Sequence, residues 1–169
     1  MGNFMTKYIP LLFMVFLTSA CEAGSNKNEA AKHLTDSEFL QQSKYMQKAF
    51  EQTPFSALIK IISVKTIDIP DDDPSDDYVE QKLVYQAKVI ETYRGSVGSE
   101  LSYDMYIEKG ESAEFIEEPF IITLCQSKEG FYWPGVGASF SADKRLVDLA
   151  KKQVNKLDKK QTSFSGCDD

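Results

Sequence analysis

The sequence has little of the chemistry that catalysis or metal binding needs. It contains one histidine, His33, and three cysteines in 169 residues. A zinc site usually takes three or four His, Cys or carboxylate ligands, and a histidine-dependent nucleophile needs its base held in a packed pocket. We expect a solvated His33 beside a helix start. The chain also has no Cys-x-x-Cys pair, Gly-rich phosphate loop or serine-nucleophile motif, so it predicts a non-enzymatic protein.

Positive charge is also scarce. The chain has 19 Lys and Arg against 26 Asp and Glu, for a formal net charge of -7. Nucleic-acid binding depends on an excess of Lys and Arg that neutralises phosphates, and an acidic protein is repelled by an anionic lipid surface. We therefore expect no nucleic-acid partner and no electrostatic adsorption onto a membrane.

Long apolar runs are missing apart from one near the start of the chain. Residues 8–20 form a mostly apolar run after Lys7, but a transmembrane helix needs about 20 apolar residues. The run ends in Leu17-Thr18-Ser19-Ala20-Cys21. This pattern resembles the signal peptide and lipobox of bacterial lipoproteins. An ordinary cleaved signal peptide, with Cys21 incidental, is the alternative.

The resemblance to lipoproteins implies a location. Residues 1–20 would be the signal peptide, and Cys21 would carry acyl chains, palmitate among them, that hold the protein to a membrane of the cell envelope. Glu22 is not the aspartate of the usual inner-membrane retention signal. The outer membrane is therefore the favoured site, with the protein facing the periplasm or the exterior.

The remaining chain predicts one globular domain. Residues 21–34 are mostly small and polar, as in a flexible tether, and residues 35–169 are enough for one core and not for two. Thr35-Asp36-Ser37-Glu38 is a capping box that predicts a helix start, and Thr53-Pro54 should end that helix. Ser141 is the expected cap of a last helix, whose apolar stripe runs from Leu146 to Leu157.

Between the helices the sequence alternates or is rich in Ile and Val, which predicts strands. The expected strands are 55–69, 83–89, 101–107, 120–125 and 131–133, with a turn region at 93–98 and a charged loop at 109–118. The near-continuous apolar segment 120–125 is expected to be central. About five strands flanked by an N-terminal and a C-terminal helix predict an α+β domain. A small antiparallel barrel is the expected closure, because it removes exposed edges.

Two segments resemble a known barrel family. Val84 to Gly98 reads VYQAKVIETYRGSVG, and Phe120 to Cys125 reads FIITLC. Both resemble segments of netrin-like, or metalloprotease-inhibitor-like, OB barrels. The resemblance implies an OB-like barrel over roughly residues 55–140. It does not carry over the inhibitory mechanism of that family, which uses a free N-terminal cysteine, because acylation is expected at Cys21.

Cys125 and Cys167 are the only cysteines besides Cys21. Cysteines in an oxidising compartment often pair, and a bridge between these two would enclose the last helix. The alternative is a buried Cys125 in a strand and an unpaired Cys167 near the C-terminus.

The segment from Asp71 to Asp77 is the candidate metal site. It offers five carboxylates, those of Asp71, Asp72, Asp73, Asp76 and Asp77. Calcium takes six to eight oxygen ligands, but the segment lacks the glycine and glutamate of an EF-hand. A solvated acidic loop is the preferred interpretation, with no cofactor, and calcium binding is the alternative.

Tyr132 and Trp133 are the candidate partner-binding residues, because aromatic side chains concentrate at interfaces. Packing of this pair against the last helix is the alternative.

The glutamates in residues 108–118 suggest a second kind of site, the carboxylate pair of a hydrolase. The alternative is that they only solvate a surface loop.

We expect a membrane-anchored envelope lipoprotein that binds an envelope protein partner. A small-ligand or calcium-binding module is the second hypothesis.

Overall fold

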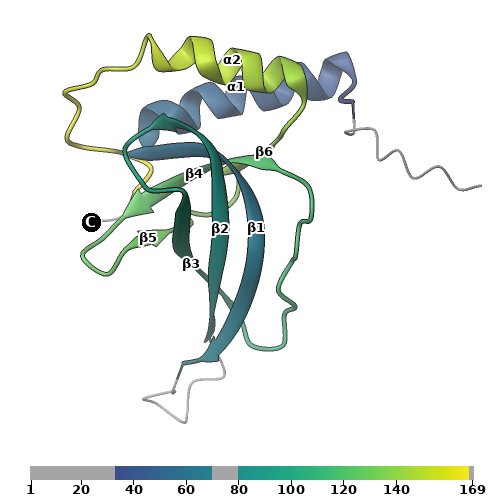
Figure 1. Cartoon of the computed structure of the whole chain (residues 1–169), viewed down its shortest axis with the longest axis vertical. Coiled ribbons are helices and arrows are strands. Elements are labelled where there is room, and N and C mark those ends of the chain that lie inside the picture. Colours follow the sequence, from purple (N-terminus) through teal and green to yellow (C-terminus); the bar gives the residue numbers. More distant parts are fainter. Residues whose placement is uncertain (1–32, 70–79, 168–169) are drawn as a thin grey trace, which may run out of the picture.

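The computed structural model describes residues 33–69 and 80–167 and has an α+β architecture, as predicted (Figure 1). In chain order the elements are α1 (Asp36–Gln52), β1 (Phe55–Asp68), β2 (Glu80–Arg94), β3 (Glu100–Glu108), β4 (Phe120–Gln126), β5 (Phe131–Tyr132), β6 (Ser139–Ser141) and α2 (Lys144–Val154). Within the described ranges, neither helix has the length and apolar character needed to cross a membrane.

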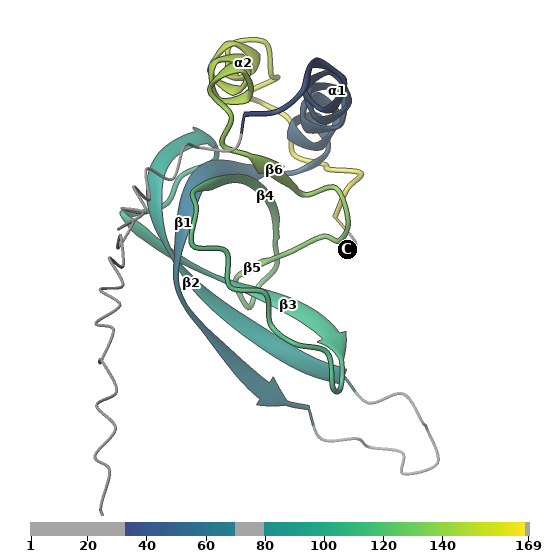
Figure 2. The same cartoon turned by 90° about the vertical axis from the view of Figure 1, so that its right-hand side faces the viewer.

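The sheet closes on itself into an uneven, roughly barrel-like ring (Figure 2). The order around the ring is β1-β2-β3-β5-β4, and β4 pairs back onto β1. All these pairings are antiparallel except β3–β5, which is parallel. The sixth strand, β6, pairs with β4. The prediction of about five antiparallel strands therefore missed β6 and the parallel pair, because strands of two and three residues leave no period-two pattern.

The long β1–β2 hairpin gives the ring its uneven shape. The two strands have 14 and 15 residues, with register irregularities at three points between Ser56 and Ser63. Such irregularities bend a strand, and β1 accordingly pairs with β2 along its length and with β4 through residues 55–59. Strand β2 spans Glu80–Arg94, so it begins before and ends after the predicted segment 83–89, and the turn expected from residue 93 begins later.

Strand β4 is buried on both faces, which confirms its predicted central position. Its first six residues are buried. Phe120, Ile122 and Leu124 belong to the core inside the barrel, while Ile121 packs in a second core beneath the helices. Figure 2 shows both helices on the outside of the ring, on the side of β4 and β6. A near-continuous apolar run is what such two-sided burial requires.

The ends of the helices partly match the prediction. At α1 the capping box is confirmed: Thr35 Oγ1 accepts from the Glu38 backbone N–H at 3.3 Å, and the Glu38 carboxylate accepts from the Thr35 N–H at 2.8 Å. At α2 the expected cap, Ser141, is wrong. Asp143 caps the helix by accepting from the Arg145 N–H at 2.8 Å. Ser141 ends β6, and the helix stops at Val154 rather than Leu157.

The Tyr93-Arg94-Gly95 segment, within the stretch 84–98 compared above with OB barrels, forms a junction between the sheet and α1. Tyr93 packs on Phe50, with ring centroids 5.9 Å apart, and Arg94 Nη1 donates to the Phe50 carbonyl at 2.6 Å. Gly95 has φ +78°, and a Cβ there would lie 2.9 Å from Phe55 Cδ2. Only glycine adopts this conformation readily, so the motif serves the packing of the fold.

Candidate functional site: a cavity in the barrel

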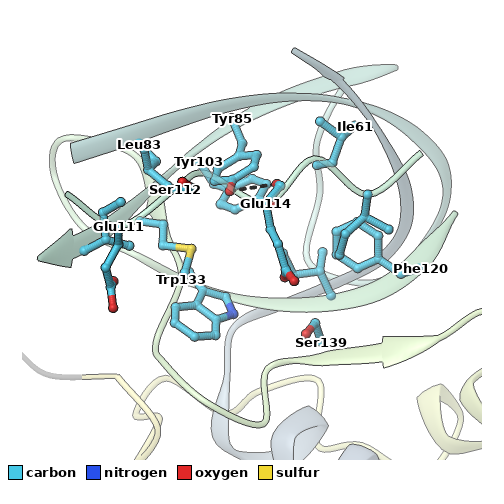
Figure 3. Close-up of a pocket in the computed structure, with 14 residues that line it drawn as sticks. Ile61, Leu83, Tyr85, Tyr103, Glu111, Ser112, Glu114, Phe120, Trp133 and Ser139 are labelled. Atoms are coloured by element: carbon cyan, nitrogen blue, oxygen red, sulfur yellow. Dashed lines mark hydrogen bonds between the residues drawn. The ribbon is translucent and has the colours of Figure 1, made fainter. Parts of the chain in front are cut away.

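The barrel interior is not filled at one end, where a cavity of about 490 Å³ opens (Figure 3). Ligand pockets are commonly about 300–1,000 Å³ and mainly apolar, with a few polar groups. This cavity fits that description. Its lining residues come from β1, β2, β3, β4, the segment after β5, the first residue of β6 and the loop between β3 and β4. They are Ile61, Leu83, Tyr85, Tyr103, Met105, Ile107, Glu111, Ser112, Glu114, Ile116, Phe120, Ile122, Trp133 and Ser139.

Two stacked tyrosines form part of the cavity wall. Tyr85 and Tyr103 are cross-strand partners on β2 and β3, with ring centroids 5.0 Å apart and planes 6° from parallel. Burial raises the pKa of both hydroxyls. Both therefore stay neutral at physiological pH. Tyr85 also donates to the Glu114 carbonyl at 3.1 Å, which ties the β3–β4 loop to the barrel.

Trp133 stands at the side of the cavity. Its backbone N–H donates to the Asp104 carbonyl at 2.8 Å, which holds the residue after β5 against β3. Its side chain is half-buried and packs against the core inside the barrel. Figure 3 shows the indole ring facing the cavity, across from Phe120 and Tyr85. The alternative in which Trp133 packs against the last helix is therefore wrong, because the side chain belongs to the barrel core and not to the core beneath the helices.

The two aromatic residues proposed for partner binding do not share one site. Tyr132 lies in β5, opposite Cys125 on one side and Asp104 on the other, and it is half-buried. It does not line the cavity, whereas Trp133 does. The structure thus separates two adjacent residues that were proposed together, since successive residues of an extended chain point to opposite faces.

Carboxylates are the charged groups at the rim. Glu111 and Glu114 line the opening from the exposed β3–β4 loop, and Figure 3 shows the Glu114 side chain extending between Trp133 and Phe120. Among the residues described, no lysine or arginine lines the cavity. Lys82 forms an ion pair with Asp104. Their neighbours in sequence, Leu83 beside Lys82 and Tyr103 and Met105 beside Asp104, line the cavity. The ion pair therefore lies on the outer face of the sheet.

The glutamates considered for hydrolysis are not brought together as a set. Of Glu108, Glu111, Glu114, Glu117 and Glu118, only Glu111 and Glu114 line the cavity, and all five are exposed. Over residues 33–69 and 80–167, there is no group of three or more His, Cys, Asp or Glu side chains placed to hold a metal ion. The acidic segment 71–77 and the lipidation candidate Cys21 lie outside the described residues.

The two remaining cysteines lie together in the structure as a disulfide. Cys125 at the end of β4 is bonded to Cys167, with Cα atoms 5.5 Å apart. The segment before Cys167 crosses the end of α1, where the Gly166 N–H donates to the Gln52 carbonyl at 2.9 Å. A Cβ on Gly166 would lie 2.8 Å from that same oxygen. The bridge and this contact together fasten the C-terminal segment to both the sheet and α1.

The single histidine lies where the chain before α1 meets the N-cap of α2, and it does not line the cavity. The His33 side chain is 79% exposed, and its Nδ1 lies 3.3 Å from a carboxylate oxygen of Asp143. That carboxylate also accepts from the Leu34 N–H at 3.1 Å. The histidine is thus a largely solvated residue beside a helix start, in agreement with the expectation from the sequence.

Comparisons with known proteins give no family for this chain. No protein-family model matches it, and no curated protein matches it either. The cavity and the segments that surround it are therefore the features that bear on its function.

Proposed function

We propose that this chain is a membrane-anchored lipoprotein of the cell envelope, and that its barrel is a non-catalytic module that binds a partner protein at the open end. The lipobox-like pattern ending at Cys21 supports the anchor. The ring order β1-β2-β3-β5-β4, closed onto β1, supports an OB-like barrel, a five-stranded Greek-key arrangement that recurs in binding modules.

The observation that carries the proposal is the cavity itself. It combines an apolar interior, a half-buried tryptophan at its side and carboxylates at its rim. Tryptophan is enriched among residues that dominate binding energy. Around the cavity the structure offers apolar, aromatic and carboxylate groups that can recognise a partner.

The test is cross-linking of the tagged full-length protein in intact bacteria, followed by mass spectrometry. Trp133→Ala should reduce capture of a reproducible envelope partner at least tenfold, because it removes a central apolar contact. Tyr45→Ala is the matched control, since Tyr45 is an aromatic residue 54% exposed on α1, away from the cavity. Equal capture by wild type and Trp133→Ala would remove the barrel opening from the partner site.

Tyr132→Ala separates the two aromatic neighbours in the same experiment. Because Tyr132 does not line the cavity, we expect its replacement to leave capture close to that of wild type once folding is verified by circular dichroism. If Tyr132→Ala abolished capture while Trp133→Ala did not, the partner surface would lie on the outer side of β5.

A further inference from the structure

We propose that the cavity binds an alkylammonium group, meaning a positively charged nitrogen carried on an aliphatic body. The group is either that of a small free amine or that of a lysine side chain on the partner protein. The inference deepens the proposed function and rests on it in one respect, that the open end of the barrel is the binding site.

Charge at the opening favours a cation. The charged side chains that line the described cavity are both carboxylates, Glu111 and Glu114. The loop that carries them has four glutamates and one lysine between residues 109 and 118. A cleft lined by one sign of charge concentrates ligands of the opposite sign. The same field opposes fatty acids, phosphates and other anionic ligands.

The aromatic walls favour an ammonium group in particular. Tyr85, Tyr103, Phe120 and Trp133 all line the cavity. The faces of aromatic rings attract cations, and quaternary ammonium groups are typically bound in aromatic cages. Both tyrosine hydroxyls remain neutral, because burial raises their pKa. The negative charge of the site therefore stays at the rim, and the tyrosines in the wall add no charge of their own.

The distribution of polarity sets the orientation of the ligand. Ile61, Leu83 and Ile122 line the deep part of the cavity and are at most 3% exposed. Met105 and Ile107 are half-buried, and the carboxylates are exposed. An aliphatic body would bury its surface against the deep residues, while the ammonium group would stay near the exposed Glu114 and the half-buried Trp133, which both line the cavity.

The chain contains its own reporter for this site. Trp133 is the single tryptophan of the sequence and lines the cavity, so intrinsic tryptophan fluorescence of the full-length protein reads this position alone. We would titrate with hexyltrimethylammonium, with hexanol as the neutral analogue and with hexanoate as the anionic one. We expect a saturable change with the ammonium probe, binding at least tenfold weaker for hexanol, and no saturation with hexanoate.

A charge-neutral variant tests the role of the rim. Glu111→Gln combined with Glu114→Gln keeps side-chain size and should weaken hexyltrimethylammonium binding about threefold to tenfold, as expected for two partly screened carboxylates. Hexanol binding should not change. The matched control is Glu117→Gln with Glu118→Gln, which makes the same charge change in the same loop at residues outside the cavity lining. This control should bind the probe within twofold of wild type.

Several results would overturn the inference. They are an absence of saturable fluorescence change with hexyltrimethylammonium, equal or tighter binding of hexanol or hexanoate, and equal weakening by the two double variants. Each variant is first checked for a cooperative urea transition, and a misfolded Gln pair is replaced by Glu114→Gln alone.

The two sources of the ammonium group are distinguished by a second pair of probes. Free hexylamine is compared with the capped tripeptide acetyl-Leu-Lys-Leu-amide and its version acetylated on the lysine side chain. Tighter binding of the tripeptide, lost on acetylation, identifies a partner lysine, and tighter binding of hexylamine identifies a free amine. If the probes bind but Trp133→Ala leaves partner capture intact, the proposed function fails and the cation site stands. If partner capture depends on Trp133 but no probe binds, the proposed function stands and the cation site fails.

Discussion

Arg94 reaches from the end of β2 to two segments that are distant in sequence. It donates to the Phe50 carbonyl in the last turn of α1 and to Gln161 Oε1 at 3.0 Å, and its guanidinium lies 4.7 Å from the centroid of the Phe164 ring. The carbonyls of a last helical turn have no partner within the helix. Arg94 therefore completes α1 and holds the C-terminal segment against it.

Replacement of Arg94 should be costly for stability. We expect Arg94→Ala to lower the free energy of unfolding by about 1.5–3 kcal/mol, because hydrogen bonds from a charged group are lost and the partly buried Phe50 carbonyl is left unpaired. Urea unfolding measures the change. Lys144→Ala is the control, since Lys144 forms an exposed i,i+4 pair with Asp148, and its loss should leave the free energy of unfolding nearly unchanged. Equal effects of the two changes would contradict this role for Arg94.

Asp143 makes stability depend on acid pH. Burial alone would raise the pKa of its carboxyl group, but hydrogen bonds from Arg145 and from the Leu34 N–H outweigh burial and lower the pKa from 3.8 to about 2. A carboxylate with a folded-state pKa below its unfolded value stabilises the protein above the unfolded pKa. That contribution is lost as pH falls from about 4 towards 2.

The matching experiment follows Asp143→Asn by urea unfolding across pH 2 to 7. We expect the variant to be less stable by about 1–3 kcal/mol at pH 7, because asparagine can still cap the helix but the charge-assisted hydrogen bonds from Arg145 and the Leu34 N–H are lost. The difference from wild type should shrink below pH 4. A difference that stays constant down to pH 2 would show that the carboxylate does not titrate in this window.

At the scale of elements, the segment after α2 acts as a fastening across the fold. It leaves α2, passes Arg94 and the end of α1, and is bonded at Cys167 to Cys125 in β4. The bridge spans 42 residues and encloses β5, β6 and α2. A covalent loop of this length restricts the unfolded chain more than the folded one.

Removal of the bridge should therefore destabilise the domain. Cys125→Ala with Cys167→Ala should lower the free energy of unfolding by about 2–4 kcal/mol, measured by urea unfolding. In the presence of a reductant, the wild-type protein should unfold at a urea midpoint close to that of the double variant. The midpoint of the double variant should not change with the reductant. A wild-type midpoint unchanged by full reduction would contradict the prediction.

Elements with strong local signals could be predicted, and those set by distant contacts could not. The capping box at Thr35 and the apolar run of β4 identify α1 and a central strand correctly, because the signals lie within the elements themselves. Strand β6 could not be predicted, because its three residues become a strand only by pairing with β4. Asp143 could not be identified as the cap of α2, because Ser141, two residues earlier, is an equally acceptable capping residue.

At the scale of the whole molecule, the cavity is beyond sequence reasoning. Alternation in β3 correctly places Leu101 and Tyr103 on an inward face. Whether the interior is then filled depends on the curvature of the β1–β2 hairpin and on the path of the β3–β4 loop, neither of which has a local signature. The sequence points to Trp133 as an aromatic residue of interest but pairs it with Tyr132, which faces elsewhere.

The lipid anchor can be tested on the intact protein. If Cys21 is acylated, Cys21→Ser should move the protein from the membrane fraction to the released fraction and abolish labelling by a palmitate analogue. The barrel should stay folded, because α1 begins 15 residues later, at Asp36. Wild-type protein that is not labelled, or a Cys21→Ser variant that stays with membranes, would contradict lipidation at this residue.

The start of the domain also has a mechanical consequence. Leu34 is held at both backbone atoms by the beginning of α2: its N–H donates to Asp143 at 3.1 Å, and its carbonyl accepts from Arg145, which also pairs with Asp36 at 2.8 Å. Tension applied to the chain ahead of His33 would meet this clamp before it reached the first turn of α1. The pull would then be shared by two helices, and α1 would resist being peeled from the barrel one turn at a time.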